Sequence, residues 1–273
     1  MTQPLQRVQK VLSLAVAAVA AAALAGCGST PPNLQPPARE QRQASDNADP
    51  ERRAQLRLEL AGMYFSRGQS ATALDEVQQA LSAKPNLPEA YGLRGLIYAS
   101  MGDIPRSEDS FKRALDMSPR DPDTMHNFGW VLCQQQRYGE ANGLFERALA
   151  QPQYREQQRT WLAQGVCHAR AGRWGDAERT LSRSYELEPG NPVTAFNLSE
   201  VLLRRGELER ARFYVARINA VPELSSAQSL WLAARIERRS GNVASVQSFG
   251  RQLLDRFPQS PEALQFEKGR FDE

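Results

Sequence analysis

The feature that most constrains the fold of this chain is an internal repeat. Tyr64 and Gly68 are followed 34 residues later by Tyr98 and Gly102, and small, aromatic and closing proline residues recur in step with them. Six such units can be aligned, at residues 54–87, 88–121, 122–155, 158–191, 192–225 and 227–260. A unit of this length buries too little surface to fold alone, so we expect the units to stack into one array.

The residue types within each unit predict two helices joined in a hairpin. Two helices approach closely only where side chains are small, as at Gly95 and Ala114, while Phe111 and Phe145 fill the remaining space. Glycines that accept a left-handed turn end the first helices, and prolines end the second ones. The glycines expected in this role are Gly68, Gly102, Gly172, Gly206 and Gly241.

This pattern resembles the tetratricopeptide repeat. The resemblance implies an all-α, right-handed superhelix of about six helical hairpins over residues 54–260, with a capping helix and tail at residues 261–273. It also implies that partners bind along the inner face, which the first helices line. One departure is Gly250, which stands where the sixth unit would carry a bulky residue.

The first 26 residues have the three parts of a secretory signal peptide. Arg7 and Lys10 precede a charge-free apolar run from Val11 to Ala25, and small residues follow. This run is shorter than the ~20 residues of a membrane span, so a retained transmembrane helix is the weaker interpretation. We therefore predict that residues 1–26 direct export and are then removed.

The end of this signal resembles the lipobox of bacterial lipoproteins, Leu24-Ala25-Gly26-Cys27. The resemblance implies cleavage before Cys27 and lipidation of that cysteine. The alternative is a secreted protein with a chance cysteine. Gly28 stands where inner-membrane lipoproteins often carry aspartate, which favours the periplasmic face of the outer membrane. Residues 27–53 are rich in proline and poor in apolar side chains, so we expect a flexible tether between the anchor and the repeats.

Charge and motifs exclude several classes of function. The formal charge of +3 falls to +1 without the signal, because Arg7 and Lys10 are lost and no acid is. A nearly neutral chain does not indicate a nucleic-acid partner. The sequence contains no phosphate-binding loop, dinucleotide fingerprint, nucleophile elbow or zinc-protease helix motif. We therefore predict a protein that binds other proteins, with no enzymatic activity, cofactor or small-molecule substrate.

Once Cys27 is lipidated, Cys133 and Cys167 remain, an even number in an oxidising compartment. They lie on first helices of adjacent units, and we prefer a disulfide, which requires Cα atoms within ~7 Å. Two alternatives use His126 and His168, which lie in the same units. A zinc site of two cysteines and two histidines has poor spacing. A Cys–His nucleophile lacks a third group to orient it.

Two groups of residues on the inner face are candidates for partner binding. The first three units present an apolar stripe, for which ordinary packing is the alternative. The later units present arginines that suit an acidic segment or a polar polymer, unless Glu200, Glu207 and Glu237 balance them and leave a solvated face. The apolar stripe is Leu58, Phe65, Leu96 and Trp130, and the second possible patch is Arg170, Arg204, Arg235, Arg238 and Arg239.

Two segments narrow the resemblance further. The run from His126 to Gln135, with Pro152-Gln153-Tyr154, and the tail from Arg256 to Glu262 are similar to the type IV pilus biogenesis lipoproteins called PilF or PilW. This family resemblance implies a pilotin, which binds the pilus secretin subunit, escorts it to the outer membrane and supports its multimerisation, and hence pilus stability and twitching motility. The alternative is another repeat lipoprotein that serves cell-wall or outer-membrane-protein assembly.

Overall fold

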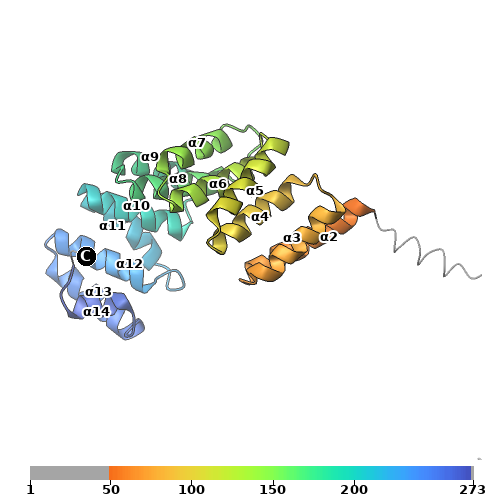
Figure 1. Ribbon diagram of the computed structural model, residues 1–273. Coiled ribbons are helices and arrows are strands. Elements are labelled where there is room, and N and C mark those ends of the chain that lie inside the picture. Colours follow the sequence, from red (N-terminus) through yellow and green to blue (C-terminus); the bar gives the residue numbers. More distant parts are fainter. Residues whose placement is uncertain (1–48, 272–273) are drawn as a thin grey trace, which may run out of the picture. The chain divides into compact units, whose positions relative to one another are not determined.

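The computed structural model describes residues 49–271, which form thirteen helices and no strand (Figure 1). The all-α prediction is therefore confirmed for this part of the chain. The predicted signal peptide at 1–26, the lipidation site Cys27 and most of the predicted tether lie outside the described residues. Within residues 49–271, no helix is long and apolar enough to cross a membrane.

The helices follow one another as six hairpins and a final short helix (Figure 1). The first three hairpins are α2 Pro50–Ser66 with α3 Ser70–Ala83, α4 Pro88–Ser100 with α5 Ile104–Met117, and α6 Pro122–Gln134 with α7 Tyr138–Leu149. The next three are α8 Gln157–Arg170 with α9 Trp174–Leu187, α10 Pro192–Arg205 with α11 Leu208–Asn219, and α12 Ala227–Arg239 with α13 Val243–Arg256. The chain then forms α14 Pro261–Glu267.

Local capping chemistry fixes where several of these helices begin. The carboxylate of Asp121 accepts a hydrogen bond from the Thr124 backbone N–H at 2.9 Å at the start of α6. Helix α2 begins at Pro50, inside the range of the predicted tether, because Asp49 accepts from the Glu51 N–H at 3.1 Å and proline suits the first turn. The first hairpin therefore includes residues that composition alone assigns to a linker.

Left-handed turns end five of the first helices, as expected. The five predicted glycines all have positive φ angles, between 73° and 80°. In the third hairpin the same position is taken by Gln136, at φ 61°, which is the one non-glycine residue with positive φ in the described chain. A side chain in this conformation costs roughly 1–2 kcal/mol, so the third hairpin carries local backbone strain.

Glycine on a first helix lies directly against an aromatic ring of its partner helix. A Cβ atom added at Gly95 would lie 2.8 Å from the Phe111 ring, and one added at Gly129 would lie 2.9 Å from the Phe145 ring. Both rings are fully buried and fill the space between helices, as predicted. The closest neighbour of Gly95 is therefore the ring of Phe111, where the sequence suggested Ala114.

The two helices of each hairpin lie on different sides of the array. Each first helix packs against the next first helix, from α2 and α4 to α10 and α12. Among the described residues, no two successive second helices come into contact in this way. The array therefore curves with its first helices on the inner face and its second helices spread on the outer face.

Helix α14 is the predicted capping helix. It packs against both α12 and α13. A Cβ atom at Gly250 would lie only 1.8 Å from Cζ of Phe266, so the glycine leaves room for a ring that α14 supplies. The apparent departure from the repeat pattern is explained, because the bulky group comes from the cap.

Candidate partner-binding surface

The four residues of the predicted apolar stripe are partly buried and belong to two separate clusters. Leu58 and Phe65 on α2 pack against the core of the first hairpin, which includes Ala61 and Val77. Leu96 on α4 and Trp130 on α6 pack against the next core, around Phe111, Phe128 and Phe145. All four therefore contribute to packing, and each leaves part of its side chain exposed.

Trp130 connects the apolar residues with the basic ones. The guanidinium of Arg170, on α8, lies over the indole ring of Trp130, 5.1 Å from the ring centroid. A cation held over an aromatic face at this distance is attracted by the ring quadrupole. Arg170 is therefore placed beside the apolar stripe and away from the other four arginines.

The other four predicted arginines come together on the inner face. Arg204 of α10 and Arg235, Arg238 and Arg239 of α12 line one pocket of about 380 Å³ with Leu203 and Phe271. The Arg239 guanidinium donates to the Leu203 carbonyl at 3.0 Å, and the Arg238 guanidinium lies 5.5 Å from the Phe271 ring centroid. Phe271 could not be predicted from the repeat pattern, because it follows the cap and reaches this pocket from outside the repeats.

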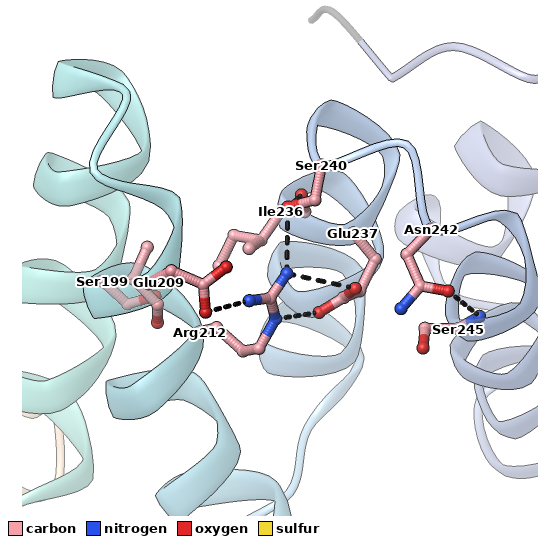
Figure 2. A network of polar contacts seen from close by, with 9 residues as sticks. Ser199, Glu209, Arg212, Ile236, Glu237, Ser240, Asn242 and Ser245 are labelled. Carbon is pink, nitrogen blue, oxygen red and sulfur yellow. Dashed lines mark hydrogen bonds and ion pairs between the residues drawn. The ribbon is translucent and has the colours of Figure 1, made fainter.

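The sequence offered three glutamates that could neutralise the arginines of this pocket, and one of them pairs with these arginines. Glu200 lies 3.9 Å from the Arg235 guanidinium. Glu207 instead pairs with Arg205 and Arg210. Glu237 is buried and pairs with Arg212 of α11 (Figure 2). Among residues 49–271, four arginines line the pocket and Glu200 is the one of these three glutamates that pairs with them, which suits a carboxylate-bearing partner.

Figure 2 shows how Arg212 joins α11 to α12. Its guanidinium donates to the two carboxylate oxygens of Glu237, at 2.6 and 3.4 Å, and to the Ser240 hydroxyl at 3.0 Å. Glu209 also accepts from it. Hydrogen bonds to Glu237 and Glu209 raise the pKa of Arg212. This network is a structural joint between the fifth and sixth hairpins.

The structure places Cys133 of α6 and Cys167 of α8 in a disulfide, with Cα atoms 5.8 Å apart. The bond joins neighbouring first helices, as the spacing suggested. With both thiols bonded, neither is placed as a zinc ligand or a nucleophile. Among residues 49–271, no group of three or more His, Cys, Asp or Glu side chains is arranged to hold a metal ion.

The two histidines have separate environments. His126 Nδ1 lies 2.8 Å from the Thr160 hydroxyl, which also lies 2.7 Å from the Tyr154 hydroxyl. Burial, and secondarily the charge of Arg159, lowers the pKa of His126 to about 3. This buried network ties α6 to α8 and to the irregular loop that precedes α8. His168 lies on the outer side of α8 and lines a different pocket.

Comparison with known proteins identifies the class. One family model described as tetratricopeptide repeat matches residues 58–122 and 126–192, and a second with the same description matches residues 168–236. The chain therefore belongs to the tetratricopeptide repeat family, and the predicted superhelix of helical hairpins is confirmed.

More particular similarities lie within this family. The type IV pilus assembly protein PilF of Pseudomonas aeruginosa is 24% identical over 219 residues, which are 80% of this chain and 86% of that protein. The crystal structure of PilW, described as a widely conserved type IV pilus biogenesis factor, superposes with a TM-score of 0.73 at 28% identity and covers 78% of this chain and 97% of its own. A structure of Pseudomonas aeruginosa PilF gives a TM-score of 0.71 at 21% identity, covering 82% of this chain and 100% of its own. The resemblance to PilF and PilW is confirmed.

Proposed function

We propose that this protein is a pilotin of the type IV pilus: an outer-membrane lipoprotein that binds the pilus secretin subunit and supports its localisation and multimerisation. The observation that carries the proposal is the similarity to PilF and PilW, which extends over about four-fifths of the chain in both sequence and structure. The work of such a protein is binding and not catalysis.

The proposed mechanism has three parts. Acyl chains on Cys27 hold the protein at the periplasmic face of the outer membrane, because several chains on one residue anchor far more firmly than one. The proline-rich segment before Asp49 supplies reach. The inner face of the first helices holds a secretin segment until it inserts into the membrane, with Leu58, Phe65, Leu96 and Trp130 as the contact residues.

The anchor is tested by Cys27→Ala. The variant is expected to fold but to fractionate with the soluble periplasm, since it lacks the acylated thiol. Membrane fractions and the mass of the processed N-terminus are the measurements. A variant that stays in the outer membrane would show that attachment does not depend on Cys27.

The contact residues are tested by comparing the two halves of the inner face. Large side chains desolvated in a groove supply most of the binding energy at protein interfaces, so Trp130→Ala or Phe65→Ala is expected to weaken secretin binding by ~2 kcal/mol or more. Arg238→Ala and Arg239→Ala remove solvated charges and should each cost under ~1 kcal/mol. Because Trp130 also packs against the core, each variant needs a melting temperature near that of the unchanged protein.

The measurements are secretin multimers, surface pili and twitching motility. All three should fall for Trp130→Ala and persist for the arginine variants. If the arginine variants lost multimers and pili while Trp130→Ala kept them, the contact site would lie among the arginines of α10 and α12. If deletion of the whole protein left multimers and pili intact, the pilotin assignment would be wrong.

The basic pocket favours one alternative. Four arginines around 380 Å³ suit a partner with an acidic segment, as an adaptor of cell-wall or outer-membrane-protein assembly could require. A pull-down from detergent-solubilised envelope separates the two proposals. Secretin in the eluate supports the pilotin, whereas murein enzymes or barrel-assembly subunits without secretin support the adaptor.

A further inference from the structure

The outer side of the junction between the third and fourth hairpins holds a polar pocket of about 520 Å³. Helices α7 and α9 form its walls and α8 forms its floor. Trp161, Gln164 and His168 share one face of α8, since residues at i, i+3 and i+7 lie along the same side of a helix. The pocket is therefore separate from the inner face, where the partner-binding residues described above lie.

The floor of this pocket carries three polar atoms that the described chain leaves without a hydrogen-bond partner. They are Nε1 of Trp161, Oε1 of Gln164 and Nδ1 of His168, all shielded from solvent. Gln164 is 4% exposed and His168 is 5% exposed. An unsatisfied buried polar group costs about 1–3 kcal/mol, so a ligand that supplies the missing partners gains free energy on binding.

The neighbouring outer junctions are closed by the chain's own ion pairs. Between the fifth and sixth hairpins the position that corresponds to His168 is Glu237, which Arg212 satisfies (Figure 2). Between the fourth and fifth hairpins Glu178 pairs with Arg205 and Arg210. Between the second and third hairpins Glu108 pairs with Arg137. Between the fourth and fifth hairpins the Tyr185 hydroxyl also lacks a partner, so among these four junctions the one at α7, α8 and α9 is distinguished by three such atoms on one helix.

Two of the three atoms define the chemistry of a ligand. Trp161 Nε1–H needs an acceptor and Gln164 Oε1 needs a donor, and a carboxamide offers both within one planar group. The Nε2 of Gln164 already donates to Asn142 Oδ1 at 2.7 Å. Rotating the Gln164 amide would place its Oε1 against the Asn142 Oδ1, an acceptor held in place because Asn142 Nδ2 donates to Glu146. The orientation that leaves Oε1 in need of a donor is therefore the favoured one.

The rim of the pocket indicates what the carboxamide belongs to. Glu146, Arg173, Asp176 and Arg179 line its edge, so it has charges of both signs. Burial, and secondarily Arg173, lowers the pKa of His168, so the floor is uncharged at neutral pH. A neutral floor disfavours a simple ion, and a rim of mixed charge would be left unused by a neutral glycan. A peptide can pair with the rim through residues beside the carboxamide.

We propose that this pocket binds the side-chain carboxamide of a glutamine or asparagine in an extended polypeptide segment of a partner protein. The site is a second interaction surface on the outer face. It stands whether or not the inner face binds a secretin.

The test uses the full mature chain in detergent and a synthetic peptide, acetyl-Lys-Gln-Glu-amide, with acetyl-Lys-Leu-Glu-amide as the matched control. The readout is the indole N–H signal of Trp161 by ¹H–¹⁵N nuclear magnetic resonance, assigned by its loss in Trp161→Phe. We expect a saturable shift with the glutamine peptide and binding at least about tenfold weaker with the leucine peptide, since ~1.4 kcal/mol is tenfold.

Variants separate binding from folding. Gln164→Leu and His168→Leu should each weaken peptide binding by about tenfold or more. The melting temperature of His168→Leu should stay level or rise, because it removes an unsatisfied buried atom, whereas Gln164→Leu also loses the hydrogen bond to Asn142. Arg238→Ala on the inner face is the control and should bind the peptide normally. Equal binding of both peptides, no saturable shift, or a preference for N-acetylglucosamine over the glutamine peptide would overturn the proposal. The last result would assign the pocket to a glycan.

Discussion

The ion pair between Arg212 and the buried Glu237 allows the stability of the contact between α11 and α12 to be tested with single substitutions. The side chain of Glu237 is 5% exposed and that of Arg212 is 32% exposed. Arg212→Leu removes the guanidinium and leaves a carboxylate in the interior between α11 and α12. We expect a large loss of stability that comes from the glutamate left behind and not from the pair's own favourable energy.

The magnitude follows from the environment of the two groups. Removing one partner of a buried pair typically costs 3–5 kcal/mol, because the remaining charge is uncompensated. The partial exposure of Arg212 lets water reach the site, so we expect about 3 kcal/mol. Replacing both partners with leucine should recover most of this, to within about 1 kcal/mol of the unchanged protein, since apolar replacements of buried pairs are often neutral. The positions that correspond to Glu237 in the third and fifth hairpins are Leu132 and Leu202, both buried, so the repeat accepts leucine there.

Four proteins form a double-mutant cycle: the unchanged protein, Arg212→Leu, Glu237→Leu and the double variant. Urea unfolding of each, followed by circular dichroism, gives its free energy of unfolding. Hydrogen exchange of the α11 and α12 amides localises the effect, because a repeat array can open from one end. Arg183→Leu is the control, since its pair with Glu186 is exposed and should be worth under ~1 kcal/mol. The reasoning fails if Arg212→Leu costs no more than Arg183→Leu, or if the double variant is as unstable as the single one.

Three further predictions concern stability. Non-reducing peptide mapping should find Cys133 joined to Cys167, and two free thiols in protein from the periplasm would contradict this bond. Replacing both cysteines with serine should lower the melting temperature by several degrees, because a disulfide that closes a loop of this span contributes ~3–4 kcal/mol. Gln136→Gly should raise the melting temperature by about 1–4 °C by relieving the positive φ, whereas Gln134→Gly, at the last residue of α6, should not raise it. The folded-state pKa of His126, about 3, lies below its unfolded value, so the unfolded state binds more protons between them. Stability should therefore fall as pH drops from about 6.5 toward 3, and less steeply in His126→Gln than in the unchanged protein.

Local chemistry explains why the fold was predictable. A glycine that ends a helix, a proline in a first turn and an alanine at a close contact each act within one hairpin, so their spacing reveals the repeat directly. Gln136 is the exception, because the structure of the hairpin imposes a left-handed turn on a residue that does not favour it. The repeat is thus strong enough to override one unfavourable residue.

The surfaces were less predictable because they depend on contacts between units. Sequence spacing placed Glu237 beside the arginines of α12, yet in the structure it points toward α11 and pairs with Arg212. Phe271 reaches the basic pocket from beyond the capping helix, so the repeat pattern does not predict its position. Trp130 was identified as an apolar contact, whereas the cation of Arg170 that lies over it could be found only by placing α6 beside α8.

The junction of the third and fourth hairpins brings together a buried polar network, the disulfide and the outer pocket. The loop before α8 carries Tyr154 into a buried network with Thr160 and His126. The Cys133–Cys167 bond fastens the inner side of the same junction. On the outer side, three buried polar atoms lack partners, which opposes stability there. A covalent link beside such a site offsets that cost and keeps the pocket in shape when no ligand is bound. We therefore see the disulfide as support for the outer pocket as well as a bond between units, because the outer contacts of Glu108, Glu178 and Glu237 at the other junctions are ion pairs within the chain.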